Sequence, residues 1–245
     1  MTLQSAPSLT DQIYGAVVEE ICAGRLAPGM HLVQEQLAER FGVSRQLIQQ
    51  AMGRLKADGM VEELAKRGLF VTLLDTDRML QHYGVRAAVD GYAARVAAER
   101  AKADKGFAAD TRRAGYAILT AGEAAVAAGA VLEQIRLDGA LHQMLYAWSG
   151  NPMIATTAEP HWRFLRRAMG SVLRAAEPPC EIWRQHRGIV EAVTSGDAPR
   201  AERRALDHVE NAARLLARAL AGAKGATRKA PRRRAAAARG EAQLP

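Results

Sequence analysis

Apolar residues recur every three or four positions through most of the chain, which is the spacing of one face of an α-helix. Near the start such a repeat runs from Leu9 to Ile21. It follows Ser8 and Asp11, which have the spacing of a capping box. This pattern predicts a first helix over residues 8–23.

The next stretch predicts a helix-turn-helix followed by a hairpin. Short helices are expected at 34–41 and 45–57, with a glycine turn at Gly42 and Ser44 as the N-cap of the second helix. The apolar run after Asp58-Gly59 predicts two short strands around a tip at 66–68. This order of elements is that of a winged-helix domain.

Beyond Asp75 the helical spacing continues to about Ala221. Loop signals rich in Gly, Pro, Asn and Asp divide this part of the chain into separate helices. They are expected at 76–102, 107–128, 131–148, 152–174, 179–194 and 197–221. The predicted fold class is therefore mainly α, with a winged helix-turn-helix domain at 1–75 and an all-helical bundle at 76–221.

Composition restricts the class of protein. At 245 residues, of which 49% are hydrophobic, the chain can form two domains that each bury a core. No run of about 18 uncharged apolar residues occurs and the N-terminus lacks the pattern of a signal peptide, so we expect a cytoplasmic protein with no membrane partner. Cys22 and Cys180 fit neither a disulfide framework nor a CxxC metal motif.

The positive charge is concentrated at the C-terminus. The net charge is +8, and residues 221–245 hold seven basic residues against one acidic residue, which leaves only +2 for the rest of the chain. The pI of 9.9 therefore does not by itself indicate a nucleic-acid-binding fold. Residues 222–245 are expected to form a disordered basic tail.

The helix expected at 45–57 has the side chains of a DNA-reading helix. Its outward side carries Arg45, Gln46, Gln49 and Gln50 near the N-terminus, where such groups reach base edges in the major groove. Ser44 and exposed amides can hold phosphate. The alternative is an ordinary solvated helix.

A second pattern turns polar residues inward. On the helix expected at 131–148, Asp138 and His142 lie on the apolar face, and two later helices carry His186 and His208 in the same way. A buried aspartate is unfavourable unless it is paired or binds a cation. One carboxylate and three imidazoles suit Zn²⁺, Ni²⁺ or Mn²⁺. The alternative is a set of hydrogen-bonded core residues.

The first 75 residues resemble the N-terminal domain of GntR-family transcriptional regulators. A Pro28-Gly29 turn, the motif LAERFGVSR, a glycine before the hairpin and a glycine at the wing tip occur in the family's order. The resemblance implies a homodimer that binds a palindromic DNA operator, with Arg45 reading a base. It also implies a wing tip formed by Lys66, Arg67 and Gly68.

One position departs from the family. Its members commonly carry an Arg-Glu pair where this chain has Gln49-Gln50. Glutamine pairs best with adenine, whereas arginine favours guanine. We therefore expect an operator that differs from the usual G-rich half-site at one base.

The rest of the chain resembles the FCD effector-binding domain of the FadR branch. The matching segments are RAAVD at Arg86 to Asp90, then DGALH, SGN, QHRGIVEAVTSGD and a final DH. The resemblance implies a metal site at Asp138, His142, His186 and His208. Asp90 replaces the family's glutamate, which could loosen packing, and His31, His82 and His161 match no ligand position.

A small organic acid is the expected effector. Arg86 lies on an inward row and could clamp its carboxylate, although a structural Arg86–Asp90 pair is the alternative. Arg163 and Asn151 could also line the cavity, or Asn151 could cap the helix that begins at Pro152. The predicted function is a metabolite-responsive transcriptional regulator. A metal sensor and a metal-dependent hydrolase are the alternatives, the latter without a general base or nucleophile beside the quartet, so no enzyme activity is expected.

Overall fold

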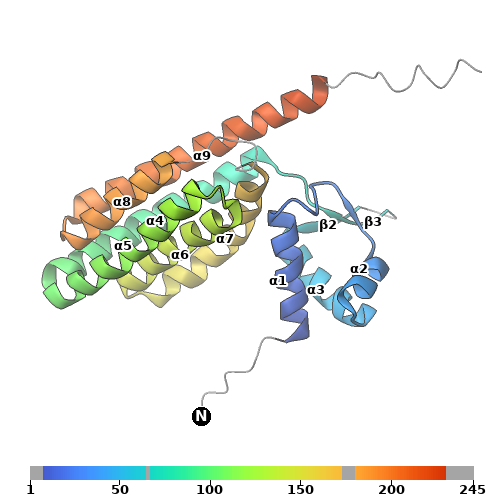
Figure 1. Cartoon of the computed structure of the whole chain (residues 1–245), viewed down its shortest axis with the longest axis horizontal. Helices are drawn as coiled ribbons and strands as arrows, with labels where there is room; N and C mark the ends of the chain where they lie inside the picture. The colour runs from blue at the N-terminus through green and yellow to red at the C-terminus, as the bar shows by residue number, and fades with distance from the viewer. Residues whose placement is uncertain (1–7, 65–66, 173–179, 230–245) are drawn as a thin grey trace, which may run out of the picture.

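The computed structural model describes residues 8–64, 67–172 and 180–229. It has an N-terminal winged-helix domain and a helical bundle that follows it (Figure 1). The first domain contains α1 (Leu9–Cys22), β1 (His31–Leu32), α2 (Gln34–Phe41), α3 (Arg45–Ala57), β2 (Val61–Leu64) and β3 (Gly68–Val71). The predicted helices and hairpin are confirmed, and β1 is an addition.

Local signals fix the ends of the first helices. The Ser8 hydroxyl accepts from the Asp11 amide while the Asp11 carboxylate accepts from the Ser8 amide, which confirms the capping box. Gly42 ends α2 with φ of 63°, a left-handed conformation that favours glycine. Ser44 then caps α3 by accepting from the Leu47 amide at 3.4 Å. The helix-turn-helix is therefore specified by local sequence.

The wing is an antiparallel sheet in the order β1-β3-β2. His31 pairs with Phe70 and Val61 with Val71. Because β1 has only two residues, no alternation of polar and apolar positions marks it in the sequence. Gly68 has a φ of 95°, and a Cβ there would lie 2.6 Å from His31 Nε2, so this position of the wing requires glycine.

The second domain is the predicted all-helical bundle. Its helices are α4 (Thr76–Ala103), α5 (Lys105–Ala127), α6 (Val131–Ser149), α7 (Pro152–Val172), α8 (Cys180–Thr194) and α9 (Ala198–Lys229). The long helices α4 and α9 run side by side along the bundle (Figure 1). A fully buried row of small side chains, including Ala93, Ala94 and Ala97, permits close packing of α4.

The last helix is longer than expected. It continues to Lys229, so the boundary predicted between bundle and tail at residue 222 does not coincide with a helix end. Alanine, lysine and arginine all favour helix, and no proline interrupts them before Pro231. The rest of the predicted basic tail, residues 230–245, lies outside the described residues.

Helix α7 connects the bundle to the winged-helix domain. The fully buried Arg167 donates to the carbonyls of Gly59 at 3.3 Å, Met60 at 3.4 Å and Leu73 at 3.4 Å. These carbonyls lie just before β2 and just after β3, so one guanidinium holds the base of the wing. Burial lowers the pKa of Arg167 to about 10, which leaves it charged at neutral pH.

The same helix approaches α1 very closely. A Cβ at Gly170 would lie 2.1 Å from the carbonyl oxygen of Cys22, so only glycine fits at this contact. The two domains are therefore packed against each other and not merely linked by the chain. Within the described ranges, no helix combines the length and apolarity needed to cross a membrane.

Candidate functional site

The four residues predicted to bind metal meet inside the bundle. Asp138 and His142 come from α6, His186 from α8 and His208 from α9, and all are buried. One donor atom of each lies within 4.8 Å of all the others. His186 Nε2 lies 3.1 Å from His208 Nε2 and 3.2 Å from Asp138 Oδ1, and His142 Nε2 lies 3.9 Å from the same oxygen.

Two of the rings are held from behind. His208 Nδ1 lies 3.1 Å from Gln185 Oε1, and His142 Nδ1 lies 3.0 Å from Asp90 Oδ2. The Gln185 oxygen is an acceptor, so His208 Nδ1 carries the ring proton and His208 Nε2 keeps its lone pair. Metal-ligating histidines are commonly oriented in this way. The contact of His142 Nδ1 with Asp90 is close but is not a hydrogen bond. The Nε2 lone pair of His142 is indicated instead by Arg86 Nη2, which donates to it. Gln185 was not identified from the sequence, because only the fold shows that it contacts a histidine on the neighbouring helix.

The charge state and spacing also fit a cation. Burial opposes ionisation of Asp138, but the hydrogen bond from His186 and nearby positive charge outweigh it and lower the pKa of the carboxyl. Burial holds the pKa of His208 well below its ordinary value. An ionised carboxylate and neutral imidazoles are the forms that bind metal. Ligands about 2.0–2.2 Å from an ion lie within about 4.4 Å of one another, so small adjustments would suffice.

Three side-chain atoms of the quartet lack hydrogen-bond partners. Asp138 Oδ2, His142 Nδ1 and His186 Nδ1 are buried with no hydrogen bond to any residue that the structure describes. Unpaired buried polar atoms are unfavourable and call for a further partner such as an ion or water.

Asp90 organises the polar residues behind the quartet. Its Oδ2 accepts from Arg86 Nε at 3.1 Å and faces His142 Nδ1, and its Oδ1 accepts from the Tyr146 hydroxyl. The Tyr146 oxygen in turn accepts from Trp162 Nε1 at 3.0 Å. The predicted Arg86–Asp90 pair is therefore present. Despite its short side chain, Asp90 engages partners through both oxygens, so the structure gives no sign of the loosened packing that was expected.

Arg86 belongs both to this network and to the pocket. Its Nη2 donates to His142 Nε2 at 2.6 Å, and the guanidinium lies 4.0 Å from the centroid of the Trp162 ring. Burial opposes its charge, but Asp90 and Asp138 outweigh burial and raise its pKa. Arg86 is thus a buried cation that also lines the cavity.

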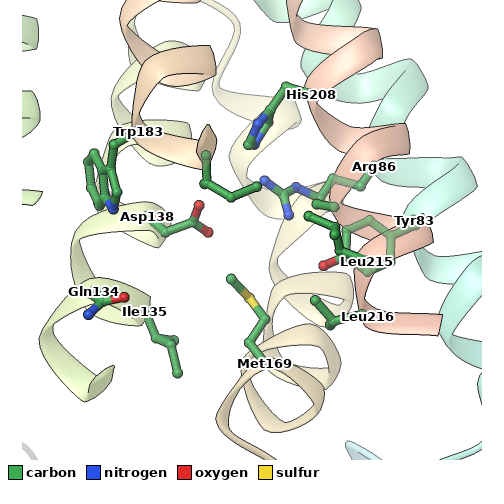
Figure 2. Close-up of a pocket in the computed structure, with 12 residues that line it drawn as sticks. Tyr83, Arg86, Gln134, Ile135, Asp138, Met169, Trp183, His208, Leu215 and Leu216 are labelled. Carbon is green, nitrogen blue, oxygen red and sulfur yellow. The ribbon is translucent and has the colours of Figure 1, made fainter. Parts of the chain in front are cut away.

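The cavity lies directly beside the quartet; its own volume is about 60 Å³, and it opens into a wider space that is continuous with solvent. In Figure 2, Asp138, His208 and Arg86 lie on one side and Ile135, Met169 and Leu216 on the other. Tyr83, Gln134, Ile182, Trp183, Ala212 and Leu215 complete the wall. The quartet therefore reaches the cavity through two of its members.

Asn151 is not brought to this cavity. Its Oδ1 accepts from the Met153 amide at 3.0 Å, so it caps α7, as the alternative interpretation held. It is exposed and lies outside the lining of the pocket.

Arg163 is also outside the pocket lining, contrary to expectation. Its Nη2 lies 3.2 Å from Asp58 Oδ1, and its Nη1 donates to Glu159 at 3.2 Å. Asp58 is the C-cap of α3 and also accepts from the Tyr14 hydroxyl at 2.6 Å. Arg163 therefore belongs to the contact between domains. Periodicity shows which face of a helix is buried, but not which domain buries it.

The remaining histidines lie elsewhere. His82 and His161 form a partly buried pair with their Nδ1 atoms 2.9 Å apart, and His31 packs on the Phe70 ring in the wing. Neither arrangement joins the quartet, in agreement with expectation.

The expected DNA-reading side of α3 faces solvent. Arg45, Gln46 and Gln49 are exposed, and Arg45 forms an ion pair with Glu35 of α2. Gln50 differs, because its Oε1 accepts from the Thr10 hydroxyl at 3.2 Å. At the wing, Arg67 and Gly68 are exposed, and Lys66 lies outside the described residues.

A winged helix with exposed polar groups on its third helix, packed on a bundle with a buried polar quartet beside a cavity, is the architecture of a two-domain DNA-binding regulator. A family profile described as "Bacterial regulatory proteins, gntR family" matches residues 9–71, and one described as "FCD domain" matches residues 81–211. The chain belongs to the GntR family and carries an FCD effector-binding domain. It is a DNA-binding transcriptional regulator and not an enzyme.

Relatives agree with this assignment. An uncharacterized HTH-type transcriptional regulator of Streptomyces ambofaciens is 32% identical over 189 residues, which cover 76% of each chain. The HTH-type transcriptional repressor RspR of Escherichia coli is 23% identical over 208 residues, covering 85% of this chain and 89% of the relative.

Solved structures share the fold. That of E. coli McbR/YncC has a TM-score of 0.72 at 18% identity, covering 85% of this chain and 97% of that one. A putative GntR regulator from Rhodococcus sp. RHA1 has a TM-score of 0.70 at 19% identity, covering 84% and 96%.

The Asp90 network yields a stability prediction. Asp90→Leu leaves the Arg86 charge buried without its partner, which typically costs about 3–5 kcal/mol. The double variant Arg86→Met/Asp90→Leu removes both charges and is expected to be more stable than Asp90→Leu alone. Urea unfolding of the metal-free protein measures both. If the free energy of unfolding falls in the double variant by the sum of the decreases in the two single variants, the ion pair is not the cause.

Proposed function

We propose that the protein is a homodimeric, cytoplasmic regulator whose helical domain binds a divalent metal and a small carboxylate effector. Asp138, His142, His186 and His208 hold the metal, and the effector modulates affinity for operator DNA. The observation that carries this proposal is the convergence of three Nε2 atoms and one carboxylate in a buried place beside a cavity that contains Arg86.

A purely hydrogen-bonded core accounts less well for the quartet. In the hydrogen-bonded arrangement Arg86 satisfies the Nε2 lone pair of His142, but a single proton on His186 Nε2 serves only one of its two neighbours, His208 Nε2 and Asp138 Oδ1, fully. Asp138 Oδ2 also remains without a hydrogen bond. A divalent cation satisfies all four donors at once.

The cavity favours an effector in addition to the metal. Binding of the metal by its four protein donors does not require the buried Arg86 or the cavity beside the quartet. Open coordination positions and the Arg86 guanidinium both suit a carboxylate. A regulator that responds to the metal alone is the second candidate, because chelation would then switch DNA binding without any acid.

Metal binding tests the first part of the proposal. His186→Gln removes one donor and is expected to weaken binding of Zn²⁺, Ni²⁺ or Mn²⁺ by more than the about 10–100-fold loss typical of residues that only support a ligand. Isothermal titration calorimetry measures this. His82→Gln is the matched control, since His82 pairs with His161 outside the quartet. Equal losses in both variants, or no binding by the unaltered protein, would refute the site.

Recognition of DNA is proposed to follow the winged-helix arrangement. Arg45, Gln46 and Gln49 of α3 enter the major groove, Ser44 contacts a phosphate, and the wing tip at Lys66, Arg67 and Gly68 approaches the backbone or minor groove. A homodimer would place two such helices on the two halves of a palindrome.

Base preference tests this arrangement. Gln49→Arg is expected to shift the preference at one operator base from adenine to guanine, a discrimination of about 1–3 kcal/mol. Binding to a panel of single-base operator variants measures the shift. Gln50→Arg is the control, because Gln50 is held by Thr10. If Gln49→Arg leaves the preference unchanged, residue 49 does not read DNA.

Helix α7 is the element proposed to couple the two domains. Trp162 contacts Arg86 and packs 5.1 Å from the His142 ring, while Arg167 holds the base of the wing and Arg163 contacts the C-cap of α3. Five residues of α-helix span only about 7.5 Å and behave as one rigid piece. A displacement at the site therefore moves the wing contacts.

Removal of one contact tests the coupling. Arg167→Met deletes the hydrogen bonds to the wing. The coupling free energy between Zn²⁺ binding and operator binding, typically about 1–3 kcal/mol, is expected to fall towards zero in this variant, while its affinity for Zn²⁺ stays unchanged. Operator affinity is compared between Zn²⁺-loaded and chelated protein. Arg113→Met, in an exposed part of α5, is the control. A full response in Arg167→Met would exclude α7 as the connection through this residue.

A further inference from the structure

The cavity beside the quartet is divided into a small polar end and a large apolar wall. Of the described lining residues, Arg86 and His208 are basic and only Asp138 is acidic, and all three lie at the polar end. Ile135, Met169 and Leu216 lie opposite them in Figure 2. Most of the other lining residues are also apolar, among them Trp183, Ile182 and Leu215. A ligand that fills the cavity therefore meets charge at one end only.

The buried charges determine how many negative groups the site accepts. Arg86 contributes one positive charge, and Asp90 and Asp138 contribute two negative charges. With a divalent ion the local sum is +1. A single carboxylate neutralises this charge, whereas a second would be buried without a counter-charge, which is strongly unfavourable.

Tyr83 supplies an additional donor at the polar end. Its hydroxyl is buried with no hydrogen-bond partner among the described residues, and its ring lies 5.7 Å from the Arg86 guanidinium carbon. Burial raises the pKa of Tyr83, so the hydroxyl keeps its proton and can donate. A buried hydroxyl without a partner is unfavourable, which points to a ligand oxygen next to Arg86.

We infer that the effector is a monocarboxylate with a compact apolar body. Arg86 and the Tyr83 hydroxyl bind the carboxylate, and the apolar body packs against Ile135, Met169 and Leu216. This inference rests on the proposed function, and it adds the chemical class of the ligand. Dicarboxylates are excluded because the wall opposite Arg86 offers a second carboxylate no positive charge. Gln134, an uncharged polar residue of the lining, already donates its Nε2 to the Ala125 carbonyl at 3.2 Å.

Pentanoate and glutarate are a matched pair of probes, since they have the same number of carbon atoms and differ in the second carboxylate. Calorimetric titration of the full, Zn²⁺-loaded chain should show pentanoate, or phenylacetate as a bulkier apolar acid, binding at least about 10-fold more tightly than glutarate. Tyr83→Phe should weaken pentanoate binding about 10-fold and leave Zn²⁺ affinity unchanged.

A charge placed on the wall tests the specificity directly. Leu215 lines the cavity yet is 48% exposed, so Leu215→Arg should fold normally and supply a partner for a second carboxylate. The affinity for glutarate should rise in this variant, so the ratio of the pentanoate affinity to the glutarate affinity should fall. Leu132→Arg, at a residue that is 40% exposed but outside the lining, should leave both affinities unchanged.

The outcomes separate this inference from the proposed function. If the unaltered protein binds glutarate as tightly as the apolar acids, the ligand class is wrong and the carboxylate effector stands. If Zn²⁺ binds but none of the three acids does, the effector half of the proposed function fails together with the inference. If Leu132→Arg has the same effect as Leu215→Arg, the cavity is not where the acids bind.

Discussion

The bundle depends on how a fully buried carboxylate, Asp90, is satisfied. Arg86 lies one turn before it on α4, and His142 and Tyr146 reach it from α6, so three groups share two oxygens. These contacts fix the rotation of the His142 ring and hold the Arg86 guanidinium over Trp162. The polar end of the cavity and the packing of α7 therefore follow from one desolvated charge, because a buried charge is tolerated only where its partners are fixed.

Helix α7 has two buried faces with different neighbours. One carries Trp162 and Met169 towards the quartet and its cavity, and the other carries Arg167 and Gly170 towards the wing and α1. Because Arg167 binds three backbone carbonyls, its contact is insensitive to the side chains of the wing but sensitive to the position of the hairpin base. Such a contact suits transmission of a rigid-body shift between domains.

Most of the fold and the four inward donors could be predicted because helical periodicity reports which face of each helix is apolar. A polar residue on that face, such as Asp138 or His208, is then identified as buried from the spacing of its neighbours. Periodicity does not report which neighbour covers the face, and for this reason Arg163 was assigned to the wrong contact. Nor does it reveal partners brought together only by the fold, such as Gln185 behind His208 or the two-residue strand β1 beside β3.

In the proposed site, metal and effector are linked through one lone pair. His142 Nε2 accepts from Arg86 Nη2 in this structure, and the same lone pair is the one that ligation requires. Since a lone pair serves one partner at a time, ligation by His142 releases a donor of Arg86 for the carboxylate. Linkage is reciprocal, so an acid that engages Arg86 also favours ligation by His142. Binding of the metal and binding of the acid therefore favour each other. Trp162 of α7 contacts both Arg86 and His142, so its position depends on whether both ligands are bound.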